Sequence, residues 1–165
     1  MRQNIRTAYN YLDKNNISFS FEILKGADIK KNDLKRIMDI YFKRRNSHNG
    51  ADSYLHQFYL KHFHYYTVAQ RALNNSYVGV LRMGGEIVAF WSGFSNWHGD
   101  YISCPRLSIN EKYSRYSPGI ILLCETAKVL KDMTGIPTLD LSRGAHSYKI
   151  RMGGIKYYSH DFAFE

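Results

Sequence analysis

The stretch that decides the fold runs from Arg106 to Arg151. It reads, in order, RLSIN (106–110), KYSRYSPG (112–119), IILLCETAKVLKDMTG (120–135) and PTLDLSRGAHSYKIR (137–151). These pieces predict a strand, a turn with Ser-Pro-Gly, a helix, a second strand, and a Gly turn that carries Tyr and Lys. We therefore expect a βαβ-like unit, with ligand binding at the carboxyl end of a strand, as in open α/β sheets.

The Ser-Pro-Gly turn at 117–119 is a candidate anion site. Pro118 fits the first turn of a helix, because its missing N–H would have no partner there. The free N–H groups of this turn lie at the positive end of the helix dipole, which favours an anion such as phosphate. The alternative is an ordinary capped helix start that binds no ligand.

Length and composition indicate a single globular domain over residues 1–165. Hydrophobic residues make up 44% of the chain, which suits a packed core and not a disordered protein. The net charge of +9 favours a polyanionic partner: nucleic acid, an acidic membrane surface, an acidic polysaccharide or a phosphorylated cofactor. The basic residues are spread along the chain, whereas a nucleic-acid surface would gather them in a stripe.

The cysteines and histidines do not indicate a disulfide framework or a metal site. Cys104 falls in a predicted strand and Cys124 in an apolar helix, so we expect reduced, packed thiols. His56, His62 and His64 lack the i,i+4 spacing of a metal pair. No apolar run approaches the ~20 residues that cross a bilayer, and no secretory signal is visible. We therefore expect a cytoplasmic protein without a membrane span.

Hydrophobic periodicity predicts an α/β (α+β) fold with a mixed, mostly antiparallel central sheet flanked by helices. Met83-Gly84-Gly85 is typical of a hairpin, and Pro105 predicts a bulge or an edge, because proline cannot donate to a ladder. Where two neighbouring parallel strands splay, the gap suits an extended arm such as the pantetheine of coenzyme A. We expect helices at 1–15, 31–45, 54–73 and 119–133, strands at 17–24, 77–82, 86–94, 101–109, 137–142 and 155–164, and a loop at 46–53.

Four segments resemble the GNAT acyltransferase superfamily, and within it the CelD-like branch (Acetyltransf_6), which is similar to FemAB-type transferases. They are VGVLRMGGEIVAFWSGF (78–94), YSRYSPGIILL (113–123), LDLSRGAHSYKIRMGG (139–154) and NIRTAYNYLDK (4–14), and together they span nearly the whole chain. The usual phosphate loop of the family carries glycines where Ser117-Pro118-Gly119 stands here. Relatives commonly have a second GNAT-like half, so the chain is either a single-domain member or one half of a tandem protein.

The resemblance implies an N-acyltransferase that passes an acyl group from acetyl-CoA or another acyl-CoA to an amine. Transfer would be direct, in a ternary complex, to a small acceptor such as an amino sugar, an amino acid or a peptide. Two alternatives stay open: a FemAB-like enzyme that uses aminoacyl-tRNA, and an inactive GNAT-like module that binds polyanions. Nucleic acid would be a partner only in these two alternatives, as the tRNA of the FemAB-like enzyme or as the polyanion that the inactive module binds. We expect a monomer or homodimer without a metal.

The same resemblance implies two catalytic candidates. Tyr148 follows the second strand of the unit, where GNAT enzymes often place the tyrosine that protonates the leaving thiolate. Its alternative is a packed aromatic with a bonded hydroxyl. Asp140 matches an acid in the family pattern and would act as a base or orient the acceptor. As a structural residue, Asp140 would instead cap the following turn or pair with Arg143.

The other candidates divide between cofactor and acceptor. Backbone groups of 107–109 would hold the pantetheine, the turn at 117–119 the pyrophosphate, and Lys149 a phosphate. The cofactor candidates are Leu107, Ser108, Ile109, Tyr116, Ser117, Pro118, Gly119, Ile120 and Lys149. The substrate candidates, chosen for an aromatic face, a base or a planar cation, are Trp97, His98, Arg143 and His146. Trp91 is expected in the core.

Overall fold

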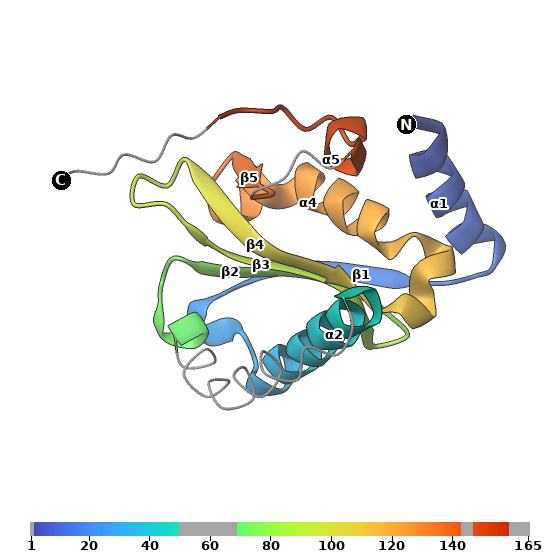
Figure 1. Ribbon diagram of the computed structural model, residues 1–165, viewed down its shortest axis with the longest axis horizontal. Coiled ribbons are helices and arrows are strands. Elements are labelled where there is room, and N and C mark those ends of the chain that lie inside the picture. Colours follow the sequence, from blue (N-terminus) through green and yellow to red (C-terminus); the bar gives the residue numbers. More distant parts are fainter. Residues whose placement is uncertain (1, 50–68, 143–146, 159–165) are drawn as a thin grey trace.

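The computed structural model describes residues 2–49, 69–142 and 147–158 (Figure 1). Outside these residues lie the predicted loop at 50–53, most of the predicted helix at 54–73 with its three histidines, and the candidates Arg143 and His146.

A five-stranded sheet forms the centre of the fold, in the order β1-β2-β3-β4-β5 (Figure 1). The first four strands pair antiparallel as a meander, and β5 pairs parallel with β4. Gly84 and Gly85 adopt φ angles of 56° and 80° between β2 and β3, as a type I′ hairpin turn requires. The sheet is mixed and mostly antiparallel, as predicted. The strands are β1 (Phe19–Lys25), β2 (Ser76–Met83), β3 (Glu86–Ser95), β4 (Tyr101–Ile109) and β5 (Thr138–Asp140).

Helices cover both faces of this sheet. The helices are α1 (Arg2–Lys14), α2 (Lys31–Asn49), α4 (Pro118–Thr134) and α5 (Ser147–Arg151), with 3-10 turns η1 (Gly26–Asp28) and η2 (Glu111–Tyr116). Helices α1, α4 and α5 lie on one face, and α2 lies on the other (Figure 1). A helix layer therefore packs on each side of the sheet, as the sequence predicts for this fold class.

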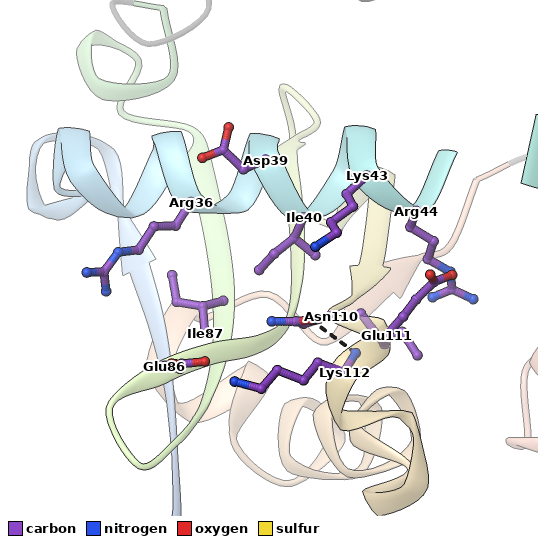
Figure 2. Close-up of a pocket in the computed structure, with 11 residues that line it drawn as sticks. Arg36, Asp39, Ile40, Lys43, Arg44, Glu86, Ile87, Asn110, Glu111 and Lys112 are labelled. Carbon is purple, nitrogen blue, oxygen red and sulfur yellow. Dashed lines mark hydrogen bonds between the residues drawn. The ribbon is translucent and has the colours of Figure 1, made fainter. Parts of the chain in front are cut away.

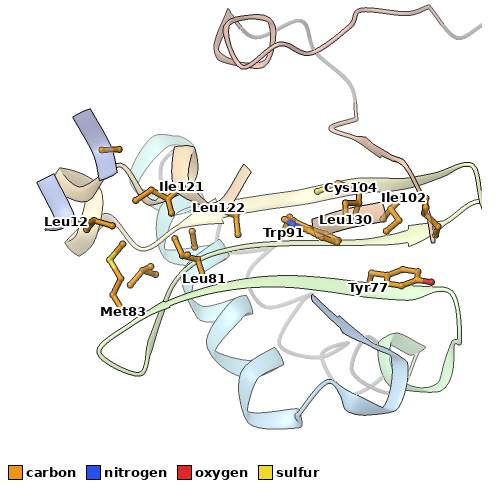
Figure 3. Packing of buried hydrophobic residues seen from close by; sticks show 14 residues of the cluster. Leu12, Tyr77, Leu81, Met83, Trp91, Ile102, Cys104, Ile121, Leu122 and Leu130 are labelled. Atoms are coloured by element: carbon orange, nitrogen blue, oxygen red, sulfur yellow. The ribbon is translucent and has the colours of Figure 1, made fainter. Parts of the chain in front are cut away.

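Trp91 fills the core between the sheet and α4 (Figure 3). Its side chain is fully buried, and its Nε1 donates a hydrogen bond to Thr126 Oγ1 at 2.8 Å. Gly79 on β2 makes room for the indole, because a Cβ there would lie 2.1 Å from Trp91 Nε1. A smaller cluster around Phe90 and Ile37 fills the space between the sheet and α2. The prediction that Trp91 is a core residue is confirmed.

Two predicted boundaries next to the site are wrong. Helix α2 continues to Asn49, although a loop was expected from residue 46. Ser47 Oγ donates to the carbonyl of Arg44 at 2.8 Å, a local bond that keeps a polar residue compatible with a helix. Strand β5 ends at Asp140 and not at residue 142, because Ser142 turns the chain with a left-handed φ of 59°.

The strand expected at 155–164 is not formed at residues 155–158. The side chains of Ile155 and Tyr158 are 93% and 75% exposed. Alternating apolar residues form a strand where they bury one face, and these bury none. Residues 159–164 lie outside the described part of the chain.

Strands β4 and β5 separate after only three residue pairs, the last of which joins Ser103 to Asp140. From residue 104 to residue 109, β4 has no β5 partner. The pairing of β4 with β3 shifts register around Pro105, and Gly93 lies within the shift, where a Cβ would meet the Ser103 carbonyl oxygen at 2.0 Å. The predicted bulge at Pro105 and the predicted splay are both confirmed.

Candidate active site

Helix α4 begins at a tight turn that leaves a backbone donor open. Ser117 adopts a left-handed conformation with φ of 52°, and its hydroxyl makes no capping bond. Its carbonyl accepts the N–H of Ile120 at 3.0 Å. Pro118 has no N–H, and the N–H of Gly119 donates no hydrogen bond within the described residues. An open helix start of this kind binds anions.

Gly119 also sets how closely α4 approaches β4. A Cβ at this position would lie 3.3 Å from Ile109 Cγ2, closer than nearly all real Cβ contacts. The segment between them is held by Asn110, whose Oδ1 accepts the N–H of Lys112 at 3.2 Å and starts η2. The first turn of α4 is thereby fixed beside the end of β4 that pairs with β3 but not with β5.

A cavity of about 400 Å³ opens over this turn, and we call it the α4 cavity. Arg44 and Arg151 contribute to its wall, and no carboxylate residue of the described part of the chain does. Most of the remaining lining is apolar, so the α4 cavity suits a polyanionic ligand with an apolar arm. It is lined by Asn4, Ile5, Arg44, Leu107, Ile109, Ser117, Pro118, Gly119, Ile120, Leu123, Tyr148, Arg151 and Met152.

The α4 cavity gathers many of the residues predicted from sequence. Those that line it are Leu107, Ile109, Ser117, Pro118, Gly119, Ile120 and Tyr148. Ser108 is buried away from the lining, and Tyr116 packs its ring against two neighbouring tyrosines. Lys149 Nζ donates to the carbonyls of Leu141 and Ser142 at 2.7 and 3.0 Å, so its ammonium holds the loop after β5.

Sequence reasoning missed several lining residues, namely Asn4, Ile5, Arg44, Leu123, Arg151 and Met152. Arg151 was detectable, because it follows Tyr148 by three residues and so shares its helix face. No sequence pattern marks Arg44 or Ile5 as a lining residue, since α1 and α2 reach the cavity only through tertiary packing.

Tyr148 is placed to hold a proton in the α4 cavity. Burial raises the pKa of its hydroxyl, nearby Cys104 raises that pKa further, and Arg44 opposes both effects. The hydroxyl therefore stays protonated at neutral pH. A protonated phenol can donate to a leaving group, which is the role that the sequence predicts for Tyr148.

The two cysteines are free, as predicted. Burial raises the pKa of Cys104 to about 12, and its thiol donates to the carbonyl of Arg106 at 3.3 Å. Burial also raises the pKa of Cys124. Both groups are thiols at neutral pH, and the thiolate is the reactive form.

Asp140 caps the turn that follows β5, which is one of the two roles expected for it from the sequence. Its Oδ1 accepts the N–H of Ser142 at 2.8 Å, just after the last β4–β5 pair. Its hydrogen bond with the hydroxyl of Tyr157 raises the pKa of that tyrosine. Asp140 thus lies at the point where the two strands separate.

Trp97 and His98 lie away from the α4 cavity. They occupy the turn between β3 and β4, where the side chain of Trp97 is 97% exposed. This turn precedes Tyr101, whereas the cavity contacts β4 at Leu107 and Ile109. Six residues of extended chain, from Tyr101 to Leu107, span about 20 Å. These two candidates therefore do not line the α4 cavity.

A second cavity, of about 340 Å³, lies on the α2 side of the sheet, and we call it the α2 cavity (Figure 2). It shares Arg44 and Ile109 with the α4 cavity. Its lining is mainly charged and comes from α2, β3 and the segment after β4. The lining residues are Arg36, Asp39, Ile40, Lys43, Arg44, Glu86, Ile87, Ile109, Asn110, Glu111 and Lys112.

Residues 1–150 match the sequence profile of the Acetyltransferase (GNAT) domain family, Acetyltransf_6. The match covers most of the chain, and the protein therefore belongs to the GNAT acetyltransferase family. Comparison with curated proteins gives no significant match.

Solved structures of acetyltransferases share the fold. A possible acetyltransferase from Clostridium difficile 630 is 11% identical with a TM-score of 0.63, over 88% of this chain and 97% of the other. An aminoglycoside acetyltransferase from an uncultured soil metagenomic sample, in complex with sisomicin, is 14% identical with a TM-score of 0.57, over 93% and 99%. AAC(6′)-Iy, in complex with the bisubstrate analogue CoA-S-monomethyl-acetylneamine, is 8% identical with a TM-score of 0.55, over 88% and 98%.

Two further findings concern the described part of the chain. It contains no helix long and apolar enough to cross a membrane. Its His, Cys, Asp and Glu side chains do not gather in threes as metal ligands would.

Proposed function

We propose that this protein transfers an acyl group from a coenzyme A thioester to an amine. The observation that carries the proposal is the α4 cavity, where an open helix start and two guanidinium groups lie beside the unpaired part of β4, with no carboxylate in the described lining. The relative solved with a CoA-containing bisubstrate analogue supports the choice of cofactor.

The residues of the α4 cavity would hold the phosphates and the pantetheine arm of coenzyme A. The Gly119 N–H, Arg44 and Arg151 would bind the phosphates, since charged donors and a helix start both favour them. The part of β4 that follows Ser103 and has no β5 partner would accept pantetheine amides, as a further strand would. Leu107 would contact its methylene groups.

Tyr148 would complete the chemistry from the same cavity. When bound, the thioester supplies an activated acyl carbon, whose bond to sulfur breaks as its bond to the amine nitrogen forms. The Tyr148 hydroxyl gives its proton to the departing sulfur and recovers one from the nitrogen. The ammonium of the acceptor first loses one proton to a base, for which Asp140 is the candidate at the strand separation.

Calorimetric titration with acetyl-CoA and desulfo-CoA tests the proposal. We expect micromolar binding of both to the native chain and about tenfold weaker binding to Arg151→Met, because a charge-assisted phosphate contact is lost. Arg115→Met is the matched control, since Arg115 stacks on the ring of Tyr116 and lies outside the α4 cavity. Absence of binding by a folded native chain would refute the proposal.

A further inference from the structure

The α2 cavity carries charges of both signs in a volume that suits a small molecule (Figure 2). Its cations are Arg36, Lys43, Arg44 and Lys112, and its carboxylates are Asp39, Glu86 and Glu111. The cations come mainly from α2, whereas two of the three carboxylates come from β3 and η2 (Figure 2). Helix α2 thus contributes three cations and one carboxylate, and the facing wall contributes two carboxylates and one cation.

Three of the four cations are available to bind a ligand. Arg36, Lys43 and Arg44 take part in none of the ion pairs found among the described residues. Glu86 accepts a hydrogen bond from the Tyr113 hydroxyl at 2.7 Å. A hydroxyl partner orients the Glu86 carboxylate without neutralising its charge.

The α2 cavity also adjoins the α4 cavity. Arg44 and Ile109 line both, although α2 and α4 lie on opposite faces of the sheet. Beyond Ser103, β4 has no β5 neighbour to close the sheet at this point. A ligand in the α2 cavity therefore lies on the other side of β4 from a cofactor bound in the α4 cavity.

We infer that the α2 cavity binds the acceptor, and that the acceptor is an amine that also carries a carboxylate, as an amino acid or short peptide does. This inference rests on the proposed function. Arg36 and Lys43 bind the acceptor carboxylate, and Glu86 attracts its ammonium. With four cations against three carboxylates, the lining repels polycations such as the sisomicin bound by the metagenomic relative.

The experiment measures acceptor binding in the presence of saturating desulfo-CoA, so that it does not depend on turnover. Calorimetric probes are dipeptides of varied side chain, each paired with its C-terminal amide, and sisomicin. We expect the tightest dipeptide to bind about tenfold better than its amide, because the amide cannot make the charge-assisted contacts. Sisomicin is expected to bind more weakly than either.

The variant Arg36→Met/Lys43→Met tests the location of this preference. Both residues are outside the α4 cavity, so desulfo-CoA should bind the variant as it binds the native chain. The preference for the free carboxylate should disappear. Lys35→Met, on an exposed position of α2 outside both cavities, should retain it.

Three results would overturn the inference: equal binding of acids and amides, tighter binding of sisomicin, or no binding of any probe. Persistence of the carboxylate preference in the double variant would refute the α2 cavity as its location. Failure of the proposed function is distinguishable, because desulfo-CoA itself would then not bind the native chain.

Discussion

Tyr148 combines a position in the α4 cavity with a raised pKa, and both features belong to a proton donor. We expect Tyr148→Phe to lower kcat by about 10²-fold, the lower end of what general acids contribute. The Kd of acetyl-CoA should stay within about twofold, because the substitution removes only the hydroxyl and keeps the ring in the cavity lining. Steady-state kinetics and calorimetry measure the two quantities. An unchanged kcat would remove Tyr148 from the chemistry.

The pH dependence of kcat follows from the same residue. A general acid works while it is protonated, so burial, which raises the pKa of Tyr148 above its ordinary value of 10.0, places the alkaline loss of kcat above that pH. Arg44 lowers this pKa, so Arg44→Met should move the loss to still higher pH. A profile measured at saturating substrates separates this effect from weaker cofactor binding. Movement to lower pH would contradict it.

The hydrogen bond between Trp91 and Thr126 fixes the position of the largest core side chain. Thr126→Val keeps the side-chain shape and leaves the Trp91 N–H buried without an acceptor. We expect a loss of about 1–3 kcal/mol in the free energy of unfolding, measured with urea. Thr138→Val, at an exposed position, should change it by less than about 0.5 kcal/mol.

At the scale of elements, Arg82 ties α2 to the sheet. Its guanidinium donates to Glu22 of β1 at 3.0 Å and to Asp33 of α2 at 2.9 Å, and these two carboxylates help raise its pKa against the effect of burial. Asp33 itself is 8% exposed. Helix α2 carries residues of both cavities, so this contact between elements supports the site from a distance.

We expect Asp33→Asn to lower the free energy of unfolding by about 1.5–3 kcal/mol, the usual worth of a hydrogen bond to a charged group. Asp39→Asn, at an exposed position of the same helix, should leave stability nearly unchanged. Urea unfolding of both variants provides the comparison. Equal stabilities would show that Arg82 does not hold α2 in place.

The helix and strand boundaries that are easiest to predict from the sequence are those set by residues within the element itself. Gly84 and Gly85 predict their hairpin through backbone freedom, and Pro118 predicts the start of α4 through its missing N–H. The strand expected at 155–164 had the right alternation, but alternation cannot tell whether a buried surface awaits it. The extent of α2 depended on a local bond of Ser47 that composition does not reveal.

The same division holds for the site. The turn at 117–119 and Tyr148 lie in motifs and were predicted, whereas Arg44 enters through the packing of α2 against β4. Trp97 and His98 were selected for their chemistry, and the direction of β4 places them at its opposite end. The sequence thus indicates which residues have suitable chemistry, but only the folded structure shows which of them lie close together.

At the scale of the whole molecule, the net charge of +9 favours an anionic cofactor, and so does the α4 cavity, whose described lining contains no acidic residue. We expect the affinity for acetyl-CoA to fall several-fold between low ionic strength and about 0.3 M salt, because screening weakens charge attraction. Acetyl-pantetheine, which lacks the phosphates, is the matched control and should show almost no salt dependence. Calorimetry at several salt concentrations measures both.

The two tryptophans have contrasting surroundings, so their intrinsic fluorescence can report on unfolding. Trp91 is enclosed in the core, and Trp97 projects into solvent from a turn. Iodide in the buffer will quench the fluorescence of Trp97 and spare that of Trp91, which leaves emission from the core alone. The quenched spectrum will then shift to longer wavelength only when the packing between the sheet and α4 opens, so unfolding can be followed without a label.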